Sequence, residues 1–279
     1  MIDRVEGFRR EFSLVDSSLQ HPFTKHERVP PLLLLVIAVI IPMMILILWT
    51  LLLPPYNRQS HTYLSRFDRA WDLNLTLLGF FLSLAATITV TNAFKSAVGR
   101  PRPDIIDRCR PSADAYSDEL YKLANWTICT RTSLLKDGFR SFPSGHSSIS
   151  FAGLGFLSLF LAGRLAVLDQ RGQVYKTVIV GAPLIAAAVV AISRLMDYRH
   201  HPFDVMFGSS LGMLIAWMAY RQFFPSISNW RSRGRPYSLL TFGEPREDRE
   251  QLIASFSGDD ELSNQGTPLD RIESPNYST

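Results

Sequence analysis

Apolar residues are concentrated in five long runs, which are separated by charged connections. Residues 29–57 and 73–94 carry no charge, and shorter uncharged runs follow at about 147–163, 177–193 and 205–220. Crossing the roughly 30 Å hydrocarbon core of a bilayer takes about 20 apolar residues, so the first two runs are long enough and the others lie near the lower limit. The pattern predicts an all-α fold, a polytopic membrane bundle of about five transmembrane helices.

A buried core helix of a soluble protein is the alternative explanation for a single run of this length. Five such runs in one chain leave too little polar surface to coat a globule, which favours membrane helices. The first run is not a cleavable signal, because it is too long, follows a polar leader and lacks a clear cleavage site. The sequence thus divides into a polar N-terminal segment at 1–31, a membrane domain at 32–220 and a mostly disordered polar tail at 221–279.

The charged connections predict how the helices are oriented. Arginine and lysine outnumber acidic residues in residues 54–70, in residues 164–176 and at the start of the tail, which marks that side as cytoplasmic. Residues 95–146 and 194–204 then lie together on the opposite, lumenal or exterior face. Topology and anionic head groups also account for the net charge of +4, and no nucleic-acid-binding pattern accompanies it, so no nucleic-acid partner is expected.

The long connection at 95–146 contains both cysteines of the chain, Cys109 and Cys129. On an oxidising face they can form a disulfide, and two free thiols are the equal alternative. Asn125 begins an Asn-Trp-Thr glycosylation acceptor in the same connection, which agrees with the orientation given by the charges.

Three clusters of polar residues lie at the ends of the predicted helices. They read KSAVGRPRP (95–103), FPSGHSS (142–148) and SRLMDYRHHPFD (193–204). Charge beside hydrocarbon is costly, which favours a functional explanation. The predicted topology places all three on one membrane face and brings together Lys95, Arg102, Arg194, Ser144, Gly145, His146, His200 and Asp204.

This set of residues suits a phosphate and its transfer. Lysine and arginine bind phosphate oxygens, and Ser144 with Gly145 before an apolar helix offers a hydroxyl and exposed N–H groups at a positive helix terminus. A neutral His200 can attack phosphorus through one ring nitrogen while Asp204 holds the proton of the other. Pro202 fits the first helical turn, which places Asp204 inside that turn.

His146 is the predicted proton donor to the departing alcohol, and opposite protonation states of two histidines predict a bell-shaped pH profile. Each cluster alone also has an ordinary explanation as a helix cap, a turn or an arginine that reaches the head groups. Their joint spacing favours one active site.

The combination of Lys95-x6-Arg102-Pro103, Pro143-Ser144-Gly145-His146 and Ser193-Arg194-x5-His200-x3-Asp204 resembles the type 2 phosphatidic acid phosphatase (lipid phosphate phosphatase) superfamily, whose motifs recur in vanadium haloperoxidases and glucose-6-phosphatase. The similarity covers roughly residues 20–225, and DGFRSFPSGHSS and SRLMDYRHHPFD look like fungal diacylglycerol pyrophosphate and phosphatidate phosphatases.

The resemblance implies a phosphohistidine mechanism on membrane lipid phosphates that needs no metal and no other cofactor. It makes His200 the nucleophile, Asp204 its partner and His146 the general acid. It assigns phosphate binding to Lys95, Arg102, Ser144, Gly145 and Arg194. An endomembrane (vacuole, Golgi or endoplasmic reticulum) or the plasma membrane would host the protein, with the active site on the lumenal or exterior face.

One departure is the number of spans, because such phosphatases usually have six. The segment before the first run resembles the one that normally follows a first helix, so the missing span is the N-terminal one, and residues 1–31 are expected on the face of the active site.

Other functions stay open on the sequence alone. Within the superfamily, the alternatives are an isoprenoid-diphosphate or a sphingoid-phosphate phosphatase. A vanadate-dependent haloperoxidase is disfavoured by the five apolar runs, and an inactive membrane scaffold by the intact His146, His200 and Asp204. The motifs do not specify the preferred lipid or the oligomeric state.

Overall fold

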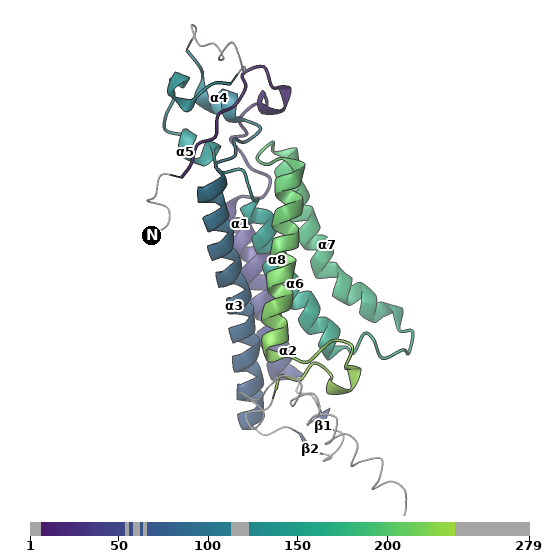
Figure 1. The fold of residues 1–279 in the computed structure, drawn as a ribbon. Helices are drawn as coiled ribbons and strands as arrows, with labels where there is room; N and C mark the ends of the chain where they lie inside the picture. Colours follow the sequence, from purple (N-terminus) through teal and green to yellow (C-terminus); the bar gives the residue numbers. More distant parts are fainter. Residues whose placement is uncertain (1–6, 54–55, 58–61, 64–65, 113–122, 238–279) are drawn as a thin grey trace, which may run out of the picture.

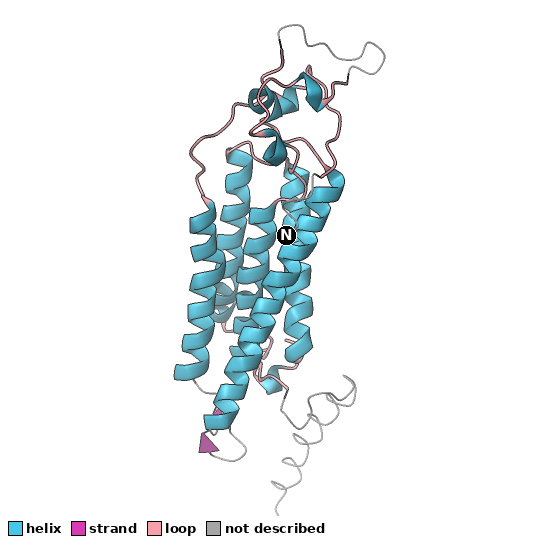
Figure 2. Ribbon diagram, turned by 90° about the vertical axis from the view of Figure 1, so that its left-hand side faces the viewer, coloured by secondary structure: helices cyan, strands magenta, loops and turns pink. Residues whose placement is uncertain are grey.

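The computed structural model describes residues 7–53, 56–57, 62–63, 66–112 and 123–237. In this part of the chain five helical segments are long and apolar enough to cross a membrane, which confirms the predicted helical bundle. The first consists of α1 (Pro31–Leu35), the π-helical turn η3 (Val36–Ile40) and α2 (Ile41–Leu52). The others are α3 (Arg66–Val98), α6 (Gly145–Arg164), α7 (Val174–Met196) and α8 (Pro202–Phe223), which run side by side in Figures 1 and 2.

The π-helical turn in the first span has a local cause. Pro42 has no backbone N–H and cannot bond to the carbonyl of Ala38 four residues earlier, so the regular α-helical ladder is interrupted there. The apolar sequence on both sides keeps the segment helical.

Helix α6 is the centre of the bundle, since most of its residues are buried. It packs against α3, α7, α8 and the first span. Small residues allow this, and the contact with α8 is particularly close. A Cβ atom on Gly208 of α8 would lie 2.6 Å from the carbonyl oxygen of Ser144, so only glycine permits this spacing of the two helices.

The short elements lie at the two ends of the bundle (Figure 1). At one end are the pair of two-residue strands β1 (Tyr56–Asn57) and β2 (Thr62–Tyr63) and the 3₁₀ turn η5 (Trp230–Ser232). At the other end are η2 (Ser17–Leu19), α4 (Ile105–Cys109), η4 (Trp126–Ile128) and α5 (Leu135–Gly138). The second group and the connection from α7 to α8 share one end, as the charge pattern predicts.

Two boundaries differ from the expected ones. Residues 224–237, expected in the tail, pack back onto the bundle: the Tyr237 amide donates to the Phe223 carbonyl at 3.1 Å, and Phe224 and Tyr237 are buried. Residues 7–30, expected to be a polar leader, contribute buried Phe12 and Leu19 to a small core. The remainder of the predicted tail lies outside the described residues.

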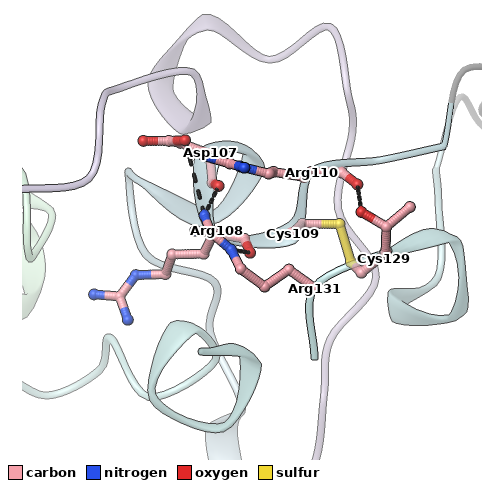
Figure 3. Close-up of a disulfide and its surroundings, with 7 residues drawn as sticks. Asp107, Arg108, Cys109, Arg110, Cys129 and Arg131 are labelled. Atoms are coloured by element: carbon pink, nitrogen blue, oxygen red, sulfur yellow. Dashed lines mark hydrogen bonds and ion pairs between the residues drawn. A yellow bond between two sulfur atoms is a disulfide. The ribbon is translucent and has the colours of Figure 1, made fainter. Parts of the chain in front are cut away.

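This small core belongs to a cap, which we define as the described residues 7–30, 99–112 and 123–143. Its buried members are Phe12, Leu19, Ile105, Cys109, Cys129, Leu135 and Phe139. Cys109 and Cys129 form a disulfide, so the bonded alternative is the one observed (Figure 3). Asn125 is exposed in the cap, and its glycosylation stays a prediction.

Candidate active site

The three polar clusters meet where the cap joins the bundle. The Ser144 amide donates to the Asp204 carbonyl at 3.0 Å, which connects the second cluster to the third. A Cβ atom on Gly145 would lie 3.3 Å from Lys95 Nζ, which places the first cluster beside the second. The predicted convergence of these remote segments is therefore present in the structure.

His200 is buried in the connection between α7 and α8, with 4% of its surface exposed. Its Nδ1 lies 2.6 Å from the backbone carbonyl oxygen of Ser141. A carbonyl only accepts hydrogen bonds, so Nδ1 carries the proton and Nε2 keeps a lone pair. Burial and the charges of Arg102 and Lys95 lower the pKa of His200 well below its usual value, which keeps the ring neutral at pH 7. The neutral form is the one that a nucleophilic histidine needs.

Asp204 does not occupy the place that the sequence predicts for it. Its carboxylate accepts from the Ser141 hydroxyl at 2.5 Å, from Arg100 Nη1 at 2.7 Å and from the His201 amide at 3.1 Å. The expectation that Asp204 binds the ring proton of His200 is corrected, since the Ser141 carbonyl does so. The reason is local: Asp204 is in the first turn of α8 and reaches back to the amide before the helix, as a capping acid does.

Ser141 thus connects the two residues that were expected to touch. Its carbonyl accepts from His200 and its hydroxyl donates to Asp204, and Ser141 itself is fully buried. Ser141 therefore connects Asp204 to His200 by two hydrogen bonds. Sequence reasoning did not single out Ser141 or Arg100, although both belong to the quoted strings.

Replacing Ser141 by alanine is expected to lower kcat about tenfold and to leave KM nearly unchanged. Alanine keeps the carbonyl that binds His200. Without the hydroxyl, however, residue 141 is no longer hydrogen-bonded to Asp204, so its backbone holds the His200 ring less firmly. Steady-state kinetics on a lipid phosphate measure this. Ser83→Ala is the matched control, because Ser83 is also buried but donates to Ala152 within the bundle. Equal losses in both variants would contradict a positioning role for Ser141.

The amino end of α6 is arranged to receive an anion. Ser144 precedes the helix, and its hydroxyl oxygen accepts from the Ser147 hydroxyl at 2.9 Å and from the Ser147 amide at 3.4 Å. Because the Ser144 hydroxyl oxygen is the acceptor in both hydrogen bonds, its proton stays available to donate to a phosphate oxygen. The first-turn N–H groups of α6 and the nearby Lys95 add positive potential at the same place.

His146 lies in the first turn of α6, and its Nε2 is 3.1 Å from the backbone carbonyl oxygen of Val29. Nε2 therefore carries a proton, and Nδ1 is the ring nitrogen left to exchange a proton with a substrate. Val29 belongs to the segment before the first span, which was not expected to contribute to the site.

The three predicted phosphate-binding cations differ in their surroundings. Arg102 donates to Asp137 through Nη2 at 2.7 Å and through Nε to the Asp137 carbonyl at 2.9 Å. Arg194 donates to Glu27 at 2.8 Å and to Asp197 at 3.1 Å. Lys95 makes no hydrogen bond or ion pair with any of the residues that the structure describes, which leaves its ammonium group ready for an anion.

A cleft borders Lys95 on the side of the cap. Its lining includes the cationic side chains of Lys136, Arg140 and Arg9. Within the described ranges no three His, Cys, Asp or Glu side chains form a group that suits a metal ion. Metal independence stays a prediction.

Comparison with known proteins identifies the family. The chain is 38% identical over 222 residues to a probable diacylglycerol pyrophosphate phosphatase 1 of Schizosaccharomyces pombe, covering 80% of this chain and 75% of the relative. It is 40% identical over 211 residues to lipid phosphate phosphatase 2 of Arabidopsis thaliana, covering 75% and 70%. Diacylglycerol pyrophosphate phosphatase 1 of Saccharomyces cerevisiae is 37% identical over 224 residues, covering 80% and 74%.

No solved structure matches the chain significantly. The family comparison matches the PAP2 superfamily over residues 76–228, which contain all three polar clusters and α6, α7 and α8. With this match and these relatives, the chain belongs to the PAP2 superfamily.

Proposed function

We propose that the protein is an integral-membrane lipid phosphate phosphatase that hydrolyses phosphatidate, diacylglycerol pyrophosphate or a related lipid phosphate. One observation carries the proposal: His200 is buried and neutral, with its Nδ1 proton bound by a backbone carbonyl, beside Lys95 and the amino end of α6. A free Nε2 lone pair next to an anion-binding helix end suits nucleophilic attack on phosphorus. The names of the relatives support a lipid substrate.

In the first step, Nε2 of His200 attacks the terminal phosphorus, and the bond between that phosphorus and the bridging oxygen of the lipid breaks. A protonated His146 gives a proton to that oxygen, so diacylglycerol leaves from phosphatidate and phosphatidate leaves from diacylglycerol pyrophosphate. The Nδ1 proton of His200 stays hydrogen-bonded to the Ser141 carbonyl oxygen. This contact stabilises the positive charge that develops on the imidazole ring.

In the second step, His146 takes a proton from water, which attacks the phosphohistidine and releases inorganic phosphate. Lys95, Arg102, Arg194, Ser144 and the Gly145 amide bind the phosphate oxygens throughout.

The site lies at the end of the bundle opposite the arginine-rich connections, which favours a lumenal or exterior face. Acyl chains can then stay in the bilayer while the head group enters from the membrane surface. The cationic side chains around Lys95 support the attraction of an anionic head group.

Phosphate release by the purified protein in detergent micelles tests the proposal. We expect hydrolysis of phosphatidate and diacylglycerol pyrophosphate, undiminished by excess EDTA, because the mechanism needs only side chains. Loss of activity with the chelator would contradict the metal-independent mechanism. Failure on every lipid phosphate, together with vanadate-dependent bromide oxidation, would contradict the proposed function itself.

A further inference from the structure

Glu27 lies outside all three polar clusters, yet it contacts two arginines of the third cluster. Its Oε2 accepts from Arg194 Nη1 at 2.8 Å across a sequence separation of 167 residues. Its Oε1 accepts from Arg199 Nη2. One carboxylate from the segment before the first span therefore bridges Arg194 in the last turn of α7 and Arg199 in the connection between α7 and α8.

These contacts are well shielded from water. The exposed fraction of the side chain is 1% for Arg194, 10% for Arg199 and 19% for Glu27. Burial alone raises the pKa of Glu27, but the charges of Arg199 and Arg194 outweigh it, and the pKa is lowered. Glu27 is therefore ionised at neutral pH, and charge-assisted hydrogen bonds of this kind are strong where water is excluded.

Glu27 completes the set of partners that fixes the plane of the Arg194 guanidinium. Ser193 Oγ accepts from Nε and Asp197 Oδ2 from Nη2, each at 3.1 Å, and Glu27 accepts from Nη1. A guanidinium binds phosphate through a planar fork, so its orientation decides which oxygens it reaches. Without Glu27, Nη1 loses its fixed partner and the charge of Arg199 repels Arg194.

The backbone around Glu27 is itself anchored to the same connection. The Thr24 hydroxyl donates to the Asp197 carbonyl, and the Arg28 amide donates to Asp197 Oδ2, each at 3.0 Å. The Phe23 ring lies 4.9 Å from the guanidinium carbon of Arg199. Glu27 is thus held in place before substrate arrives, which is what a preorganised site requires.

We propose that Glu27 is a positioning residue of the active site, which orients Arg194 to bind the phosphate of the substrate. The proposal rests on the proposed function, in which Arg194 is a phosphate ligand. Glu27 carries negative charge and acts through Arg194, without touching the phosphate. The segment before the first span then contributes a fourth part to the three-cluster site.

Replacing Glu27 by alanine in the full chain tests this in detergent micelles. We expect KM for a lipid phosphate and Ki for inorganic phosphate to rise about tenfold, with a smaller change in kcat, because the loss is in phosphate binding. Glu27→Gln is expected to lose less, since it keeps one acceptor oxygen. Glu11→Ala, an exposed acid of the same segment, is the matched control and is expected to leave both constants unchanged.

A double-mutant cycle separates positioning from a general structural role. In an Arg194→Lys background, Glu27→Ala is expected to raise Ki for phosphate by no more than about twofold further, since both changes act on one interaction. The same tenfold rise in both backgrounds would overturn the proposal. So would a lowered thermal midpoint with unchanged Ki.

A binding measurement keeps this test independent of turnover. Line broadening of inorganic phosphate in ³¹P NMR reports on occupancy of the phosphate-binding site, even if no lipid is hydrolysed. A wild-type protein that binds phosphate but hydrolyses nothing would contradict the proposed function, and weaker binding by Glu27→Ala would still support the role of Glu27. Equal phosphate binding by the two proteins would overturn that role alone.

Discussion

Replacing His200 by alanine is expected to reduce hydrolysis of lipid phosphates by about 10⁴-fold or more, which is the scale seen when a nucleophile is removed. The Nε2 lone pair of His200 is the group that forms the bond to phosphorus, and alanine offers no substitute. Phosphate release by the purified variant in micelles measures the loss.

A control variant and a trapping experiment make this result specific. His26→Ala is the control, because His26 is exposed and lies in the cap, and full activity is expected. Rapid quenching of the wild type with ³²P-labelled substrate should trap an acid-labile, base-stable phosphoprotein that the His200 variant does not form. Undiminished hydrolysis by His200→Ala would remove His200 from the mechanism.

Replacing His146 by alanine is expected to slow turnover of lipid phosphates by about 10²- to 10⁴-fold, the usual contribution of a general acid. The alkoxide of a glycerolipid is a poor leaving group and needs the proton. p-Nitrophenolate leaves without one, so hydrolysis of p-nitrophenyl phosphate should fall far less in the same variant. The ratio of the two losses is the measurement.

The pH profile gives an independent check on His146. The wild type should lose activity as the pH rises and deprotonates the proton donor, and His146→Ala should lack this dependence. Equal losses on both substrates would contradict a general-acid role and point to a structural one, since the Nε2 contact to Val29 also connects α6 to the cap.

The helices and the meeting of the clusters could be predicted from local features of the sequence. Uncharged runs of membrane length require a helix wherever they occur, and each cluster lies at the end of such a run. Pro202 two residues before Asp204 was enough to predict the first turn of α8, which the structure confirms, but the partner expected for the Asp204 carboxylate was wrong, because it accepts from the His201 amide and not from His200.

The partners of the site residues could not be predicted in the same way. The Nδ1 proton of His200 goes to a backbone carbonyl, and every residue has one, so no residue type signals it. Glu27 binds Arg194, which is 167 residues away in the sequence. Nothing in the sequence distinguishes this acid from the others in the same polar segment. The cysteines left two alternatives open because separation in sequence does not give separation in space.

The tight contact between Gly208 and Ser144 connects catalysis to the packing of two apolar helices. His146 lies in the first turn of α6 and His200 just before α8, so a change in the spacing of these two helices would move the nucleophile relative to the proton donor. A displacement of about 1 Å can cost two orders of magnitude in rate. A single added methyl group at Gly208 is therefore expected to slow turnover by displacing these two helix ends, although the group is remote from any proton transfer.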